Sequence, residues 1–155
     1  MAGAEQPARD PAARSVDGAA LLELGRRLTP RLRSVAGIVA VTAGGSAAGG
    51  TADAASDLDL GLLYDGEVGF DLAALRRLAS EVDDRRDVTL TEPGGWGPRI
   101  NGGGWLLIEG RRVDWLYREI GAVAGAIDDV RRGASPLHYQ PGHPFGWQPQ
   151  MYAGE

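Results

Sequence analysis

The chain has 155 residues, a net charge of −5 and 43% apolar residues, which is typical of one domain with a single core. Its 16 basic residues are all arginine, and cysteine is absent. These absences exclude a phosphate-loop lysine, a lysine Schiff base, a disulfide framework and a thiolate nucleophile. The negative charge argues against nucleic acid or an anionic membrane as partner. No stretch has the length and hydrophobicity of a membrane span. We therefore expect a cytoplasmic protein that binds a small molecule or another protein.

The chain begins with residues 1–14, which are rich in alanine, proline and charge, and we expect them to form a disordered tail. Leucines then recur three or four positions apart, which predicts an amphipathic helix with a cap at Ser15 or Asp17 and with Pro30 in its last turn. A short apolar run over 37–43 predicts a buried strand. The leucines of the helix are Leu21, Leu24, Leu28 and Leu32.

Three further elements are predicted between residues 57 and 104. Asp57 to Tyr64 alternates leucines with polar residues, which is typical of a strand with one polar face. Asp71 is a suitable cap for a helix, and residues 87–92 have the composition of a third short strand. The stretch 93–104 contains six glycines and two prolines and predicts a loop. The buried stripe of the helix comprises Leu72, Leu75, Leu78 and Val82.

The last part of the core, which we assign to residues 15–132, is a hairpin and a helix. Strands at 105–108 and 112–117 flank Glu109-Gly110, a favourable hairpin turn. A helix over 119–132 follows, and residues 133–155 form a Pro/Gly/aromatic C-terminal extension. The element order predicts an α/β (α+β) fold in which helices flank a mixed β-sheet. The apolar residues that we expect the last helix to bury are Ile120, Val123, Ile127 and Val130.

The stretch 44–63 reads GGSAAGGTADAASDLDLGLL and carries most of the chemical information. One interpretation is the nucleophile elbow of a serine hydrolase, but the pattern G-x-S-x-G ends at Ala48 instead of glycine. A second is a dinucleotide-binding turn with Gly44, Ser46 and Gly49 in the glycine frame. Serine at the middle position obstructs the close approach of a pyrophosphate, so this pattern is also incomplete.

A third interpretation is a metal and phosphate site. Asp57 and Asp59 are two positions apart on a strand, so their carboxylates point to the same side, where their repulsion favours a bound cation. Both histidines, His138 and His143, lie near the C-terminal end, so a metal site in the body of the domain must use carboxylates. Oxygen ligands together with phosphate suit Mg²⁺.

The preceding turn has features that suit a phosphate. Gly45 lets a phosphate approach the backbone, and Ser46 can offer its hydroxyl and the neighbouring amides to a triphosphate. Alone, an Asp-x-Asp pair is more often a solvated strand start, and Gly-Gly-Ser is usually only a turn.

The same segment resembles the signature of the DNA polymerase β-type nucleotidyltransferase superfamily, in particular its small bacterial and aminoglycoside-type members. In that family Gly-Ser closes one strand and Asp-x-Asp begins the next, as Gly45-Ser46 and Asp57-Leu58-Asp59 do here. A later strand of the family carries a third carboxylate, and Asp114 occupies the matching position. The resemblance covers residues 35–120. It implies a nucleotidyltransferase-type fold and, if Asp114 lies on a neighbouring strand, two metal ions that clamp an in-line displacement.

Single residues of this set also have structural explanations. Asp114 can serve as a structural acid that pairs with Arg111 or Arg112, an interaction worth little at a surface. The tryptophans of the core could stack a base, but tryptophan mostly supplies buried area. These tryptophans are Trp96, Trp105 and Trp115.

The leading hypothesis is an enzyme that depends on Mg²⁺ or Mn²⁺. It transfers a nucleoside monophosphate, AMP from ATP or its equivalent from another nucleoside triphosphate, to a hydroxyl of a small molecule or protein. Pyrophosphate is released. In this hypothesis Asp57, Asp59 and Asp114 are the metal-binding and catalytic residues, and Gly45 and Ser46 bind the triphosphate.

A second hypothesis assigns the chain to another class of protein. Ala47, Ala48 and Gly49 stand where many family members carry a basic residue, and the stretch 142–147 resembles the start of a longer C-terminal region of the family. These features favour a catalytically weak nucleotidyltransferase-like binding protein of the antitoxin type. Such a protein acts with a partner chain or as a homodimer, and the chain is then either a truncated core or one that its partner completes.

Overall fold

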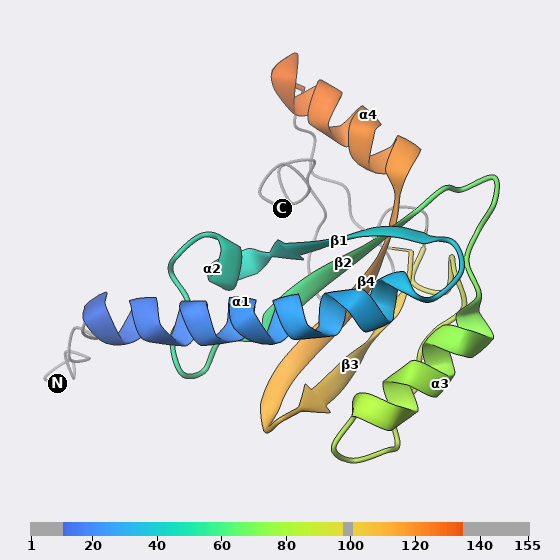
Figure 1. Cartoon of the computed structure of the whole chain (residues 1–155). Helices are drawn as coiled ribbons and strands as arrows, with labels where there is room; N and C mark the ends of the chain where they lie inside the picture. Colours follow the sequence, from blue (N-terminus) through green and yellow to red (C-terminus); the bar gives the residue numbers. More distant parts are fainter. Residues whose placement is uncertain (1–10, 98–100, 135–155) are drawn as a thin grey trace, which may run out of the picture.

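The computed structural model describes residues 11–97 and 101–134, and in it helices flank a four-stranded mixed sheet (Figure 1). The expected mixed sheet with flanking helices is thereby confirmed. Residues 1–10 and most of the extension at 133–155, with both histidines, lie outside the described residues. In chain order the elements are α1 (Pro11–Arg33), β1 (Ile38–Gly44), α2 (Gly45–Ala48), β2 (Leu58–Tyr64), α3 (Leu72–Val82), β3 (Gly103–Ile108), β4 (Arg111–Glu119) and α4 (Ile120–Arg131).

The sheet has the strand order β1-β2-β4-β3, so β2 and β4 are its central strands. β1 runs antiparallel to β2, β2 runs parallel to β4, and β3 runs antiparallel to β4. Because β3 and β4 follow each other closely, a tight turn joins them, whereas β2 reaches β4 only after α3 and β3. The parallel pair therefore brings together residues that are more than fifty positions apart, such as Leu58 and Val113.

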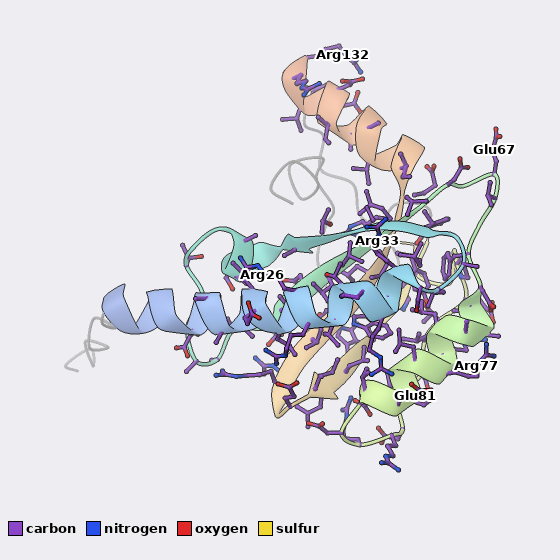
Figure 2. All side chains as sticks on the ribbon, viewed as in Figure 1. Arg26, Arg33, Glu67, Arg77, Glu81 and Arg132 are labelled. Atoms are coloured by element: carbon purple, nitrogen blue, oxygen red, sulfur yellow. The ribbon has the colours of Figure 1, made fainter. Side chains whose placement is uncertain are left out.

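One face of the sheet forms the hydrophobic core. Leu58, Leu60 and Leu62 alternate along β2 and are all almost fully buried, as period-two side chains on a covered face should be. The leucines of α1 and the apolar side of α3 pack on them. Figure 2 shows side chains gathered between α1, α3 and the sheet, while Glu67 and Arg77 point outwards. Other core members are Val113, Trp115 and Tyr117 of β4, Leu106 and Ile108 of β3, and Leu75 and Ala79 of α3.

The first helix is longer than expected. α1 begins at Pro11, inside the segment 1–14 that we expected to be a tail, so neither Ser15 nor Asp17 is its first residue. It also continues past Pro30 to its end at Arg33. Leu32 is completely buried, and its burial offsets a cost of the order that proline imposes, about 3 kcal/mol. No helix of the described ranges is long and apolar enough to cross a membrane.

The strand predicted over 87–92 is wrong. The segment runs beside the start of β3, but its backbone groups are bonded elsewhere. The Leu90 carbonyl accepts from the Arg76 guanidinium at 2.9 Å, and the Gly103 amide bonds to the Thr91 hydroxyl instead of a carbonyl. A single backbone bond, from the Thr91 amide to the Gly103 carbonyl at 2.9 Å, joins this part to β3. Because the Arg76 side chain hydrogen bonds to the Leu90 carbonyl, this segment does not form the regular ladder that its β-branched composition favours.

The helix capped by Asp71 and the hairpin are confirmed, with the hairpin turn at Glu109 and Gly110, both at positive φ. The buried stripe predicted for the last helix is confirmed only in part. Val123, Ile127 and Val130 are half-buried, but Ile120 of α4 is 38% exposed, and Ala126 is the buried residue of the helix. The reason is the connection: Glu119 is the last residue of β4 and also the cap of α4. The helix therefore leaves the end of the strand directly and extends away from α1 and α3 (Figure 1).

The packing predicts that Leu60→Ala destabilises the fold by about 3 kcal/mol, because it removes a fully buried side chain and leaves a cavity against α1. Urea unfolding followed by circular dichroism measures this change. Val68→Ala is the matched control, since Val68 is 79% exposed and its truncation should cost less than about 0.5 kcal/mol. Equal costs for both variants would contradict the assignment of Leu60 to the core.

Candidate functional site

Asp59 and Asp114 lie side by side on the sheet face opposite the core. They are direct register partners on the parallel strands β2 and β4, where neighbouring backbones are about 4.8 Å apart. Their neighbours in sequence, Leu58 and Val113, point to the core and are completely buried. The alternation that buries these two residues thus directs both carboxylates to the other face. The structure therefore brings together two of the three predicted carboxylates.

The proximity of these carboxylates is reflected in the acidity of Asp114. Burial, and after it the negative charges of Asp59 and Asp57, together raise the pKa of Asp114 from 3.8 to about 7. This net rise remains although Arg112 and a hydrogen bond from the Trp105 side chain act in the opposite direction. Neighbouring carboxylates therefore favour a proton or a cation at Asp114.

The third predicted carboxylate, Asp57, has a different partner. Its Oδ1 accepts a hydrogen bond from Nε of Arg112, and the same guanidinium donates to the Ala55 carbonyl. Arg112 stands two residues before Asp114 on β4, so it lies on the same sheet face. Arg111 lies 3.9 Å from Asp17 of α1. A cavity of about 310 Å³ adjoins this ion pair, between the 54–56 loop and the turn at Gly110.

The glycine-serine turn lies directly against Asp59. Gly44 is the register partner of Asp59 on β1, and Gly45 follows with a φ of +63°. A Cβ atom on Gly45 would stand 2.0 Å from Asp59 Oδ2, so only glycine fits. Ser46 is half-buried in the short helix α2, and its carbonyl accepts from the Thr51 amide at 3.0 Å. The space at Gly45 in which we expected a phosphate to approach the backbone is thus occupied by the Asp59 carboxylate. Phosphate binding at Gly45 and Ser46 remains a prediction.

Within 11–97 and 101–134, no three or more acidic or histidine side chains form a group that could hold a metal ion. The ion pair with Arg112 explains why Asp57 does not join the other two carboxylates. The donor set still fits Mg²⁺, which usually takes one or two carboxylates and completes its shell with water and phosphate oxygens. Asp59 and Asp114 would be the first ligands, and Asp57 could join once Arg112 moves to another anion.

Trp105, which the sequence analysis assigns mainly to buried area, instead lies exposed beside the site. It is the register partner of Asp114 on β3, its side chain hydrogen bonds to Asp114, and it is 60% exposed. Trp96 stacks on it with ring centroids 4.7 Å apart. A usable signal was present, because a two-residue turn at 109–110 fixes the register that pairs Trp105 with Asp114. Trp115, by contrast, is a core residue as expected.

Comparison with known protein families finds no family model that matches the chain. Comparison with curated protein sequences finds no match either. The functional argument therefore depends on the residues of the site and their geometry.

We predict that Gly45→Ala destabilises the fold by about 2–4 kcal/mol, because it combines positive-φ strain with a collision against Asp59. Gly50→Ala is a matched control, since Gly50 has a similar φ of +70° and no atom near its would-be Cβ. Strain alone should cost the control about 1–2 kcal/mol. Denaturant unfolding measures both, and a Gly45 variant no worse than the control would show that the contact with Asp59 is absent.

A second prediction concerns Asp114 and pH. Because its pKa is about 7 in the folded chain, against 3.8 ordinarily, the folded state binds more protons between these values. Stability should therefore fall as pH rises through this range. Asp114→Asn removes the charge, so it should be more stable than the parent at about pH 8 and no more stable at about pH 3. We expect a gain of about 1–2 kcal/mol, because solvent screens part of the full shift. Thermal unfolding without metal across pH tests this, and parallel curves for the two proteins would contradict it.

Proposed function

We propose that the chain is a metal-dependent nucleotidyltransferase with a nucleotidyltransferase-type fold of the DNA polymerase β kind. It would transfer a nucleoside monophosphate, AMP from ATP in the simplest case, to a hydroxyl acceptor. The observation that carries this proposal is the row formed by Gly44, Asp59 and Asp114, which are consecutive register partners across β1, β2 and β4. A glycine-serine turn at one end of a carboxylate pair is the arrangement that phosphoryl transfer needs.

The charge of the site supports the same conclusion. Two adjacent carboxylates offer a hard oxygen site to Mg²⁺ or Mn²⁺. The metal, when bound, would neutralise the triphosphate and stabilise the charge that develops on the oxygens around the transferred phosphorus. Asp59 and Asp114 would hold it, and Asp57 would complete the site after release from Arg112. The released guanidinium is then available to a phosphate, and it would supply the basic group that Ala47 and Ala48 do not provide.

The proposed reaction is the transfer of a nucleoside monophosphate to a hydroxyl group. The acceptor hydroxyl oxygen forms a bond to the α-phosphorus of the nucleotide, and the bond from that phosphorus to the bridging oxygen of the β-phosphate breaks. Pyrophosphate leaves with the bonding electrons, and the hydroxyl proton passes to a carboxylate. Asp114 would be placed for this role by its position beside Asp59 on the carboxylate face. Gly45 and Ser46 would hold the departing phosphates through backbone amides and a hydroxyl.

The acceptor would be a small molecule or a protein side chain. The net charge of −5 and the adjacent carboxylates of Asp59 and Asp114 repel a nucleic acid backbone and attract a cationic compound. A second candidate function is a weakly catalytic binding protein that acts with a partner chain or a second copy. The observation that favours it is the apolar surface of α4, where Ile120 is 38% exposed.

The proposal predicts that Asp59→Asn and Asp57→Asn each lower metal-dependent release of pyrophosphate from ATP on the order of a hundredfold or more. Loss of one carboxylate weakens metal binding and the stabilisation of developing charge. The measurement is a coupled pyrophosphate assay with Mg²⁺ or Mn²⁺ and a panel of hydroxyl acceptors.

Asp65→Asn is the matched control, because Asp65 follows the other end of β2 and the one bond described for its side chain is local, from the Glu67 amide at 2.8 Å. It should retain parental activity. Full activity in the Asp59 variant would refute the proposal. A parent chain that binds Mg²⁺-ATP but releases no pyrophosphate with any acceptor would instead favour the second candidate.

A further inference from the structure

β1 is an edge strand that carries no charge. The strand order places it outermost, and no strand of the described residues pairs with its outward side. Its seven residues include no charged residue and no proline, and apart from an irregularity between Ile38 and Ala40 they pair regularly with β2. Folded proteins usually protect such an edge with charges, proline or a covering element, because the outward amides and carbonyls pair readily with another extended chain. The outward side of β1 is therefore suited to strand addition.

A cavity of about 190 Å³ lies beside this strand, between α1 and β1. Its walls include Leu22 and Thr29 of α1 and Val41 of β1. The space is left because α1 packs closely on the neighbouring strand, where a Cβ atom on Gly25 would meet Leu60 of β2 at 3.4 Å. Val41 is therefore only half-buried, although it packs against the core. An apolar side chain delivered beside β1 would complete this packing.

The strand itself can deliver such a side chain from a second copy of the chain. Two identical strands that pair antiparallel are related by a twofold axis, and a residue on the axis lies opposite its own counterpart. Val41 is the middle residue of β1. An axis through Val41 places the two valine side chains on the same sheet face, about 5 Å apart, beside the cavities of both copies.

The charges of α1 fit the same arrangement. α1 runs opposite to β1, so the start of the helix accompanies the end of the strand (Figure 1). Glu23 lies in the first half of α1 and pairs with Arg26 at 3.3 Å, and Arg33 follows about two turns later. Figure 2 shows Arg26 and Arg33 on the side of α1 nearer β1. A twofold axis reverses the second helix, so Glu23 of each copy comes opposite Arg33 of the other.

The spacing of the strands leaves room for both helices. Each α1 packs over β2 of its own copy, and the two β2 strands would be separated by two β1 strands, which is about 14 Å. A helix with its side chains is about 10–12 Å wide. Long side chains therefore meet across this distance without a collision of the backbones.

We propose that β1 pairs antiparallel with β1 of a second copy, about a twofold axis through Val41, so that the two four-stranded sheets form one continuous sheet. The inference is independent of the proposed transfer reaction, and it places the second copy at β1 instead of at the apolar surface of α4. Because the axis is perpendicular to the sheet, the carboxylate pairs of both copies lie on the same side of the dimer.

Single cysteine variants test the register, because the chain has no cysteine of its own. Val41→Cys places two thiols on the axis, within reach of a disulfide. Ala43→Cys is the matched control, since it lies on the same strand two residues further on and its two thiols would be about 14 Å apart. We expect oxidised glutathione to convert the Val41 variant to a covalent dimer at least about tenfold faster than the control, measured by non-reducing electrophoresis.

A charge swap tests the contact between the helices. Sedimentation equilibrium at low salt should show a parent dimer at about 100 μM chain, and Glu23→Arg or Arg33→Glu should each raise its dissociation constant about tenfold. The two substitutions combined should restore the parental constant to within about threefold. Glu67→Arg is the matched control, because Glu67 points outwards in the β2–α3 connection and the change in net charge equals that of Glu23→Arg.

Any of three results would overturn the inference: a parent that stays monomeric at about 100 μM, equal cross-linking of the two cysteine variants, or a charge swap that restores nothing. A monomer whose β1 amides resist hydrogen exchange would show that another segment of the same chain covers the edge. An assembly larger than a dimer would exclude the closed twofold pairing.

Discussion

The burial of Asp114 and its repulsion by the Asp59 carboxylate on the paired strand are the main electrostatic constraint on this sheet face. The core residues Leu58 and Val113 fix the register of β2 against β4, and the same register places Asp59 beside Asp114. The protein cannot relieve this repulsion by moving either strand without exposing apolar side chains that are fully buried. It relieves it partly by keeping a proton on Asp114 to higher pH than usual and by engaging Asp57 with Arg112. Hydrophobic burial thus maintains an electrostatically unfavourable site, which is a common property of functional sites.

The chemical groups of the site follow the order of the strands. The glycine-serine turn ends β1, the carboxylates stand on β2 and β4, and the exposed indole stands on β3. The sheet face therefore presents the glycine-serine turn, two carboxylates and an indole ring in strand order. The carboxylates and the indole lie on regular strands and not on a long loop, so their positions are determined by the same hydrogen bonds that build the sheet.

Sequence reasoning was successful where structure depends on neighbours in the chain. The alternation before Tyr64, the cap at Asp71 and the turn at Gly110 are local signals, and each element formed as expected. The strand over 87–92 failed because a distant guanidinium, that of Arg76, takes the carbonyl that a strand would need. The incomplete burial of α4 has a similar cause, since periodicity identifies an apolar stripe but not the element that covers it.

The candidate site was predictable only in part for the same reason. The spacing of Asp57 and Asp59 predicts a polar strand face from the sequence, but no local pattern predicts that β2 pairs with β4. The side-by-side position of Asp59 and Asp114 emerges only from that long-range pairing. The sequence also does not predict that Arg112 pairs with Asp57, because the adjacent Arg111 is an equally suitable partner by sequence.

The direct passage from β4 into α4 has a mechanical consequence. Glu119 ends the strand and caps the helix through the amides of Gly121 and Ala122, so no flexible linker separates the two elements. The helix also contacts Trp96, which stacks on Trp105. The orientation of α4 is therefore tied both to the strand that bears Asp114 and to the indole beside it.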